Sequence, residues 1–254
     1  MIFSEGNKYL FIEIPLTASW AIHHELRNYY GGKPILHKHA SYAEFEANYP
    51  EQANNLFVFA AVRNPLDEIV SHFFKLKSNH KNAFSNPESA SQLLMDYVDY
   101  AKFEFVRDPE VDFADYFRKF HRHPFGSLVD IRSDRFDYVI RYEDLQAGFS
   151  EALSRLNLKQ ERLLPLVNKT EGRSKSWLDY YTEDIQGQAM RVCGPFMAKW
   201  GYEFPPGWDQ KRSRSTNTLE YRVYTLIRNY YLTHFRYKDT STSRFVRKLR
   251  AKFW

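Results

Sequence analysis

The chain has 254 residues and a mass of 30.3 kDa, a length that suits one large domain or two small ones, and we expect one. Its 43% hydrophobic and 26% charged residues exclude a disordered, collagen-like or low-complexity chain. Aromatic residues are frequent at 17%, and the formal net charge of +5, with an isoelectric point near 9.1, predicts anionic partners.

The positive charge is concentrated near the C-terminus. Residues 208–254 contain 12 Lys or Arg and 3 Asp or Glu, whereas residues 1–207 contain 24 and 28. The sequence does not open with a basic stretch followed by an apolar one, and no apolar run reaches the roughly 18 residues of a membrane span. Cys193 is the single cysteine, which excludes an intrachain disulfide and a cysteine-based zinc site. We expect a cytoplasmic protein with a main domain over 1–207 and a basic helix and tail over 208–254.

Short apolar runs alternate with helical patterns in the first part of the chain. Strands are predicted at 8–14, 34–37 and 55–62, and helices at 18–30, 42–49 and 69–76. Strands separated by helices are typical of βαβ units, so the predicted fold class is α/β with a parallel sheet.

The pattern continues after a helical insertion predicted over residues 88–123. A strand is predicted at 136–141, with a helix after it. Residues 185–200 have helical spacing, although Gly194-Pro195 is expected to kink or break that helix. A last amphipathic helix is predicted from an apolar stripe of Leu219, Val223, Leu226, Ile227 and Tyr230.

Ligands of parallel α/β proteins bind at the carboxyl ends of the strands, so the turns after the predicted strands are candidate sites. The first turn, Pro15-Leu16-Thr17-Ala18-Ser19-Trp20, leads into a helix whose free N–H groups can bind an anion. The alternative is an ordinary Ser/Thr N-cap without a ligand. No glycine-rich Walker A loop occurs in the sequence.

The turn after the strand at 55–62 contains an arginine. The guanidinium of Arg63 has a fork that matches a phosphate, and Ser71, eight residues later, can add a hydroxyl to the same oxygens. The alternative is an ion pair of Arg63 with Asp67 or Glu68.

Three motifs in combination resemble the sulfotransferases that use 3′-phosphoadenosine 5′-phosphosulfate. They are P-x-[TS]-x-[ST] at 15–19, R-[DN]-P-x-x-x-x-x-S at 63–71, and Tyr-Glu-Asp-Leu at 142–145. The resemblance extends from about Tyr9 to about Phe204. It implies a three-layer α/β/α fold with a central parallel sheet, similar to that of the P-loop NTPases.

The resemblance implies roles for individual residues. The loop around the 5′-phosphosulfate would consist of Thr17, Ala18, Ser19 and Trp20. Arg63 and Ser71 would hold the 3′-phosphate of the donor. Arg173 and Lys175 fall in a basic loop that would close over the donor, and the alternative for them is a flexible, solvated loop.

One position departs from the family pattern. Leu16 stands where family members commonly have a Lys, which balances the charge on the bridging oxygen as sulfur leaves. Within His37-Lys38-His39, the resemblance makes His39 the general base that deprotonates the acceptor hydroxyl. Lys38 or His37 would then supply the missing positive charge. The alternative is that only one of the three side chains faces inward and the others are solvated.

We therefore expect transfer of a sulfonate to a hydroxyl, with 3′,5′-adenosine bisphosphate as the second product and no metal. A carbohydrate acceptor is favoured over a phenol or lipid, since Lys75, Lys77, His80 and Lys81 form a basic strip that suits an anionic saccharide. A solvated helix end is the alternative for this strip. His23 and His24 are expected on the surface. The rival functions are a non-catalytic nucleotide-binding protein and a nucleotide kinase of the same fold class.

The basic segment 208–254 lies outside the resemblance. It suggests either contact with a membrane surface or docking on an anionic polymer. The alternative is a helix packed on the enzyme with a solvated tail. Nucleic acid is not an expected partner, because no nucleic-acid-binding motif is present.

Overall fold

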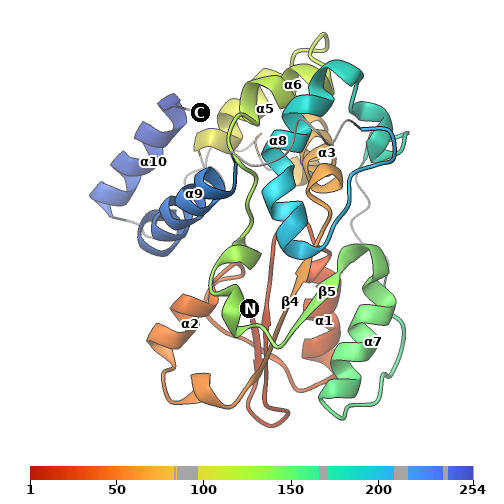
Figure 1. Ribbon diagram of the computed structural model, residues 1–254. Coiled ribbons are helices and arrows are strands. Elements are labelled where there is room, and N and C mark those ends of the chain that lie inside the picture. Colours follow the sequence, from red (N-terminus) through yellow and green to blue (C-terminus); the bar gives the residue numbers. More distant parts are fainter. Residues whose placement is uncertain (83, 85–96, 166–170, 209–216, 237–239, 254) are drawn as a thin grey trace. The chain divides into compact units, whose positions relative to one another are not determined.

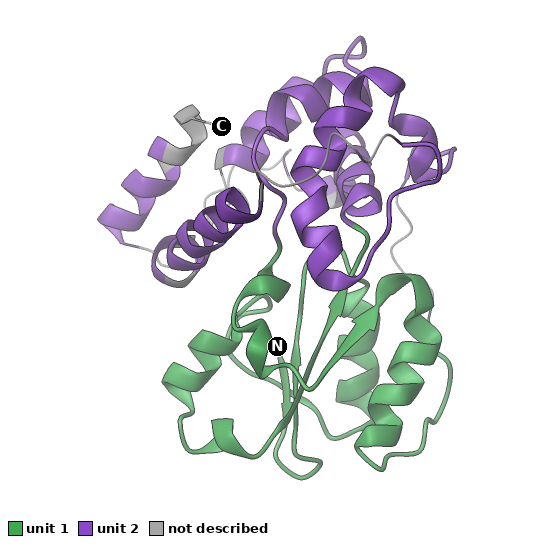
Figure 2. Ribbon diagram, in the orientation of Figure 1, with its two compact units in different colours: residues 1–64, 127–169 green, residues 65–126, 170–254 purple. Residues whose placement is uncertain are grey.

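The computed structural model describes residues 1–82, 84, 97–165, 171–208, 217–236 and 240–253, and it divides into two compact units (Figure 2). Unit 1 comprises residues 1–64 and 127–169, and unit 2 comprises residues 65–126 and 170–254. None of the described helices has the length and apolar character needed to cross a membrane.

Unit 1 is built on a five-stranded mixed sheet with the order β3-β1-β2-β4-β5 (Figure 1). Its strands are β1 Ile2–Ser4, β2 Tyr9–Ile12, β3 Lys33–Pro34, β4 Phe57–Val62 and β5 Tyr138–Arg141. Strands β2, β4 and β5 are parallel, whereas β1 is antiparallel to both β2 and β3. The α/β class is thus confirmed, but the sheet is not wholly parallel. The connection between β1 and β2 has only four residues, too few for a parallel crossover, so these strands form a hairpin.

Helices of unit 1 cover both faces of this sheet. Ile2, Phe11 and Phe59 are paired in register and share one face, where they pack with α1 Ser19–Tyr29 and α7 Leu145–Arg155. Alternation places Phe3 on the opposite face, and its ring lies 5.9 Å from Phe45 of α2 Tyr42–Asn48. Because β2, β4 and β5 are parallel neighbours, their carboxyl ends lie side by side at one edge of the sheet.

Unit 2 is helical in the part that the structure describes. Its helices are α3 Pro65–Lys77, α5 Tyr97–Val106, α6 Phe113–Phe120, α8 Glu183–Trp200, α9 Asn217–Tyr231 and α10 Ser241–Phe253. Much of the aromatic content gathers in its core, where Phe73, Phe113 and Phe117 are at most 4% exposed. Helix α8 continues through Gly194-Pro195, so the break considered for this position is absent. Gly194 has no Cβ to clash with the proline ring, which makes the helical conformation accessible there.

Short turns complete the described chain. The 3₁₀ turns are η1 Gln52–Asn54, η2 His80–Asn82, η3 Leu128–Asp130, η4 Ser133–Arg135, η5 Tyr142–Asp144 and η6 Trp177–Tyr180, and a π-helical turn, η8, spans Leu232–Arg236. Of these, η5 is the most relevant to function, because it follows β5 directly and contains most of the Tyr-Glu-Asp-Leu motif.

Candidate functional site

The turn between β2 and α1 has an unusual backbone. Leu16 and Ala18 both have left-handed conformations, with φ of 64° and 57°, which are unfavourable for residues with a Cβ. Thr17 lies between them and is fully buried, and its hydroxyl donates a hydrogen bond to the carbonyl of Ile14 at 2.9 Å. The Thr17 hydroxyl therefore stabilises the turn itself.

The start of α1 is left open by this turn. Ala18 is the N-cap and has no side-chain oxygen for the first N–H groups, and the first turn of the helix contains no acidic residue. Ser19 is 5% exposed, and its hydroxyl makes no hydrogen bond with any described residue. Trp20 is more exposed, with its ring 3.8 Å from that of His24. Unpaired N–H groups and the helix dipole favour an anion at this end of α1.

Arg63 connects this turn to the ends of two other strands of unit 1. It directly follows β4 and is 5% exposed. Its Nη1 donates to the carbonyl of Leu16 at 2.9 Å, and its Cζ lies 4.0 Å from the centre of the Tyr142 ring in η5. The three turns after β2, β4 and β5 are therefore held together by one buried guanidinium.

A pocket of about 460 Å³ lies between the first turn of α1 and the segment that follows β5. Ala18 and Ala21 line it from α1, and residues 142–147 line much of the rest. Gln146 fixes part of this wall, since its side chain bonds both the N–H and the carbonyl of Leu164 at 2.9 and 2.8 Å. A ligand in this pocket would lie beside the open N-terminus of α1.

His39 is fixed against the start of the β2–α1 turn. Its Nδ1 lies 2.9 Å from the carbonyl oxygen of Glu13. A carbonyl only accepts, so Nδ1 carries the proton and Nε2 has the free lone pair in the neutral ring. Burial lowers the pKa of His39 and the charge of Lys38 adds to this, while the hydrogen bond to Glu13 acts in the opposite direction. The ring is therefore mainly neutral near pH 7, with Nε2 as the proton acceptor.

The other two residues of His37-Lys38-His39 lie in different surroundings. The Nε2 of His37 is 3.0 Å from a carboxylate oxygen of Glu44, which also forms the capping box of α2 with Ser41. Lys38 is exposed. His39 is thus bonded to the start of the β2–α1 turn, and His37 is bonded to α2.

Glu13 and His23 belong to this site although the sequence did not indicate them. Glu13 is 1% exposed, and its carboxylate lies 3.1 Å from Nδ1 of His23 and 2.9 Å from the amino group of Met1. The side chain of His23 is 18% exposed, so this residue, expected on the surface, is partly buried. The one signal in the sequence is an acidic residue inside an apolar run, which indicates a paired carboxylate if the run is a buried strand.

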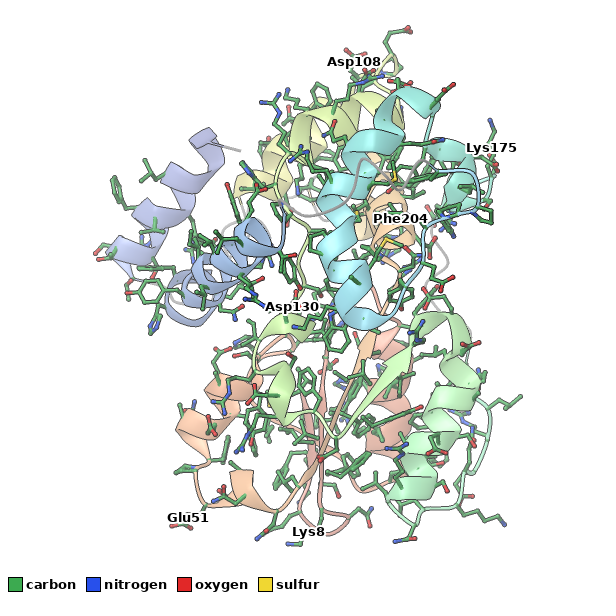
Figure 3. The ribbon with its side chains drawn as sticks, viewed as in Figure 1. Lys8, Glu51, Asp108, Asp130, Lys175 and Phe204 are labelled. Atoms are coloured by element: carbon green, nitrogen blue, oxygen red, sulfur yellow. The ribbon has the colours of Figure 1, made fainter. Side chains whose placement is uncertain are left out.

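Unit 2 contains the remaining predicted residues. Ser71 is fully buried and accepts a hydrogen bond from Nη1 of Arg173 at 3.3 Å. The same nitrogen lies 2.7 Å from a carboxylate oxygen of Asp67. Lys175 is exposed (Figure 3). The basic loop that the resemblance predicts spans 168–175. Its residues 168–170 lie outside the described residues, whereas Arg173 is anchored to α3.

Within the described part of the chain, no three His, Cys, Asp or Glu side chains gather as metal ligands. No protein-family model matches the chain, and no curated protein or solved structure matches it either.

Proposed function

We propose that the protein transfers a sulfonate from 3′-phosphoadenosine 5′-phosphosulfate to a hydroxyl, with a carbohydrate as the favoured acceptor class. The observation that carries the proposal is the position of Arg63, whose contacts join the Pro15–Ser19 motif to Tyr142 of the Tyr-Glu-Asp-Leu motif. Motifs that lie far apart in the sequence thus meet at one edge of the sheet in unit 1. The proposal includes a three-layer, P-loop-like fold, which the parallel strands β2, β4 and β5 support.

The proposed chemistry uses the open start of α1. The acceptor oxygen attacks sulfur, the bond from sulfur to the bridging oxygen breaks, and 3′,5′-adenosine bisphosphate leaves. The acceptor proton passes to Nε2 of His39, which the hydrogen bond to Glu13 leaves available. N–H groups at the N-terminus of α1 stabilise the charge that develops on the bridging oxygen. These N–H groups take the part that the Lys of family members would play, because Leu16 has no charge.

The donor's charged groups are assigned to few side chains. Thr17 holds the turn, and Ala18, Ser19 and Trp20 surround the phosphosulfate. Arg63 binds the 3′-phosphate. For Ser71, Arg173 and Lys175, which belong to unit 2, the roles at the 3′-phosphate and in the loop that covers the donor rest on the resemblance alone. The pocket beside Ala18 suits the uncharged part of the nucleotide, because Ala18 and Ala21 make that side apolar.

Titration calorimetry with 3′,5′-adenosine bisphosphate tests this proposal. Replacing Arg63 by Ala should weaken binding by about tenfold or more, the effect of losing charge-assisted hydrogen bonds to a phosphate. Arg155→Ala is the matched control, because Arg155 also stacks on a tyrosine of unit 1, with its Cζ 4.5 Å from the ring centre of Tyr138. Unchanged affinity in Arg63→Ala, or tighter binding of ATP than of the bisphosphate, contradicts the proposal.

A second candidate is a nucleotide-binding protein without turnover. It is favoured by Leu16, an apolar residue at the position where family members commonly have a Lys. Labelled donor separates the two candidates. Release or transfer of labelled sulfonate above background supports the transferase, whereas tight donor binding with no turnover across many acceptors supports the binding protein.

A further inference from the structure

Helix α9 is amphipathic, but its apolar side faces outward. Five of its side chains are 45% to 73% exposed, namely Leu219, Val223, Leu226, Ile227 and Tyr230. At about 100° per residue, these positions fall within an arc of about 100°. They form one continuous surface, which we call the α9 stripe. An apolar surface of this kind marks a binding face for a partner or a membrane.

The opposite side of α9 packs on the rest of unit 2. Tyr231 is 8% exposed, and Nη2 of Arg228 donates to the carbonyl of Pro124 at 3.1 Å. The ring of Tyr224 stacks on His123, with 4.6 Å between the ring centres. Hydrogen bonding and stacking therefore hold α9 in one orientation. The α9 stripe is the side that these contacts leave outward.

Helix α10 combines exposed apolar side chains with positive charge. Phe245 and Leu249 lie one turn apart and are 65% and 43% exposed. The sequence of α10 contains five Lys or Arg and no acidic residue. The buried side of α10 includes Ser243 and Arg247, whose Nη1 lies 3.4 Å from the carbonyl oxygen of Phe235 in η8. The two helices that follow each other at this end of the chain, α9 and α10 (Figure 1), thus both carry exposed apolar side chains.

We propose that α9 and α10 form a docking face for an anionic lipid bilayer. Aliphatic side chains of the α9 stripe would enter the boundary between headgroups and acyl chains, while the basic residues would attract anionic headgroups. Charge complementarity selects this occupant, because residues 208–254 contain 12 basic and 3 acidic residues. A second copy of the chain would bring two such segments together and repel. Binding of nucleic acid would leave an aliphatic stripe unused.

Sedimentation of the full chain with lipid vesicles tests the proposal. The chain should bind vesicles of 70% phosphatidylcholine and 30% phosphatidylserine more tightly than phosphatidylcholine alone, and 0.5 M salt should weaken the binding. The double variant Leu226→Asp/Ile227→Asp should reduce affinity by about tenfold or more. Leu163→Asp is the matched control, since Leu163 lies in unit 1 and is 72% exposed against 69% for Leu226.

A charge-reversal variant tests the electrostatic contribution to vesicle binding. Arg222 is exposed and lies on α9 beside the stripe, so Arg222→Glu should weaken binding to the anionic vesicles. Lys159→Glu, at an exposed position of unit 1, should not. Absence of binding to anionic vesicles, or equal loss in the stripe and control variants, overturns the proposal. So does a dimer in analytical ultracentrifugation that Leu226→Asp/Ile227→Asp abolishes, because the stripe then binds a second copy.

Discussion

His39 allows a test that separates a general base from a structural histidine. In His39→Asn, the amide nitrogen lies near the former position of Nδ1 and can still donate to the Glu13 carbonyl, whereas the basic Nε2 is lost. We expect turnover to fall by about 10² to 10⁴, with affinity for 3′,5′-adenosine bisphosphate close to that of the wild type. His234→Asn, at an exposed histidine of unit 2, is the control.

The ionisation of His39 can be measured directly on the protein and compared with the pH dependence of turnover. Burial lowers the pKa of His39, so its titration midpoint should lie below the ordinary value of about 6.5, and the acid limb of kcat/KM should coincide with it. Nitrogen-15 spectra of the histidine rings report both the midpoint and the tautomer, and His39→Asn identifies the signal. A midpoint at or above about 6.5, or a proton on Nε2 in the neutral ring, would refute the assignment of Nε2 as the base.

The remaining predictions concern unit 2. Arg173→Ala should lower the free energy of unfolding by about 1 to 3 kcal/mol, because it removes a guanidinium that lies 2.7 Å from the buried carboxylate of Asp67, and adding Asp67→Asn should restore part of the loss in urea unfolding. An additive double variant would show that the two residues do not interact. Burial lowers the pKa of His72 to about 4, so the unfolded chain takes up the proton first as the pH falls. The contribution of His72 to the free energy of unfolding should therefore be fully present above about pH 6.5. It should decrease by up to about 3 kcal/mol as the pH falls to 4. His72→Gln should reduce this slope without abolishing it, since burial also lowers the pKa of His39 and His121; an unchanged slope would contradict the assignment.

Strands could be predicted from the sequence where an apolar run was long enough to show a repeating pattern. Strand β4 and its following helix were expected close to their observed bounds. Strand β1 has only three residues, too few to show any alternation, and its hairpin with β2 makes the sheet mixed. The strand expected at 34–37 is shorter and ends at Pro34, because Leu36 has a φ of 52°, which extended backbone does not allow.

The site was predictable where topology alone determined it. Strand ends of a parallel sheet meet, which is why Arg63 lies beside the turn that contains Leu16. The spacing of residues along the sequence did not predict the ion-pair and hydrogen-bond partners of the side chains. Asp67, considered as a partner for Arg63, lies 2.7 Å from Nη1 of Arg173, a residue more than a hundred positions further along the chain. Glu13 shows the same limit, since its role depends on burial at the end of β2 and on His39, which lies 26 residues away.

The two proposals divide the charge of the chain between different tasks. A nucleotide with phosphate and sulfate groups needs a few directed donors, and the proposed ones come mainly from residues 1–207, which contain more acidic than basic residues. A bilayer surface has no fixed geometry, so it is recognised by the total charge and the apolar area presented to it. Residues 208–254, the segment that contains the exposed α9 stripe, have a basic excess, and they therefore suit this second kind of recognition. Screening by salt should therefore act much more strongly on vesicle binding than on the buried contacts of Arg63.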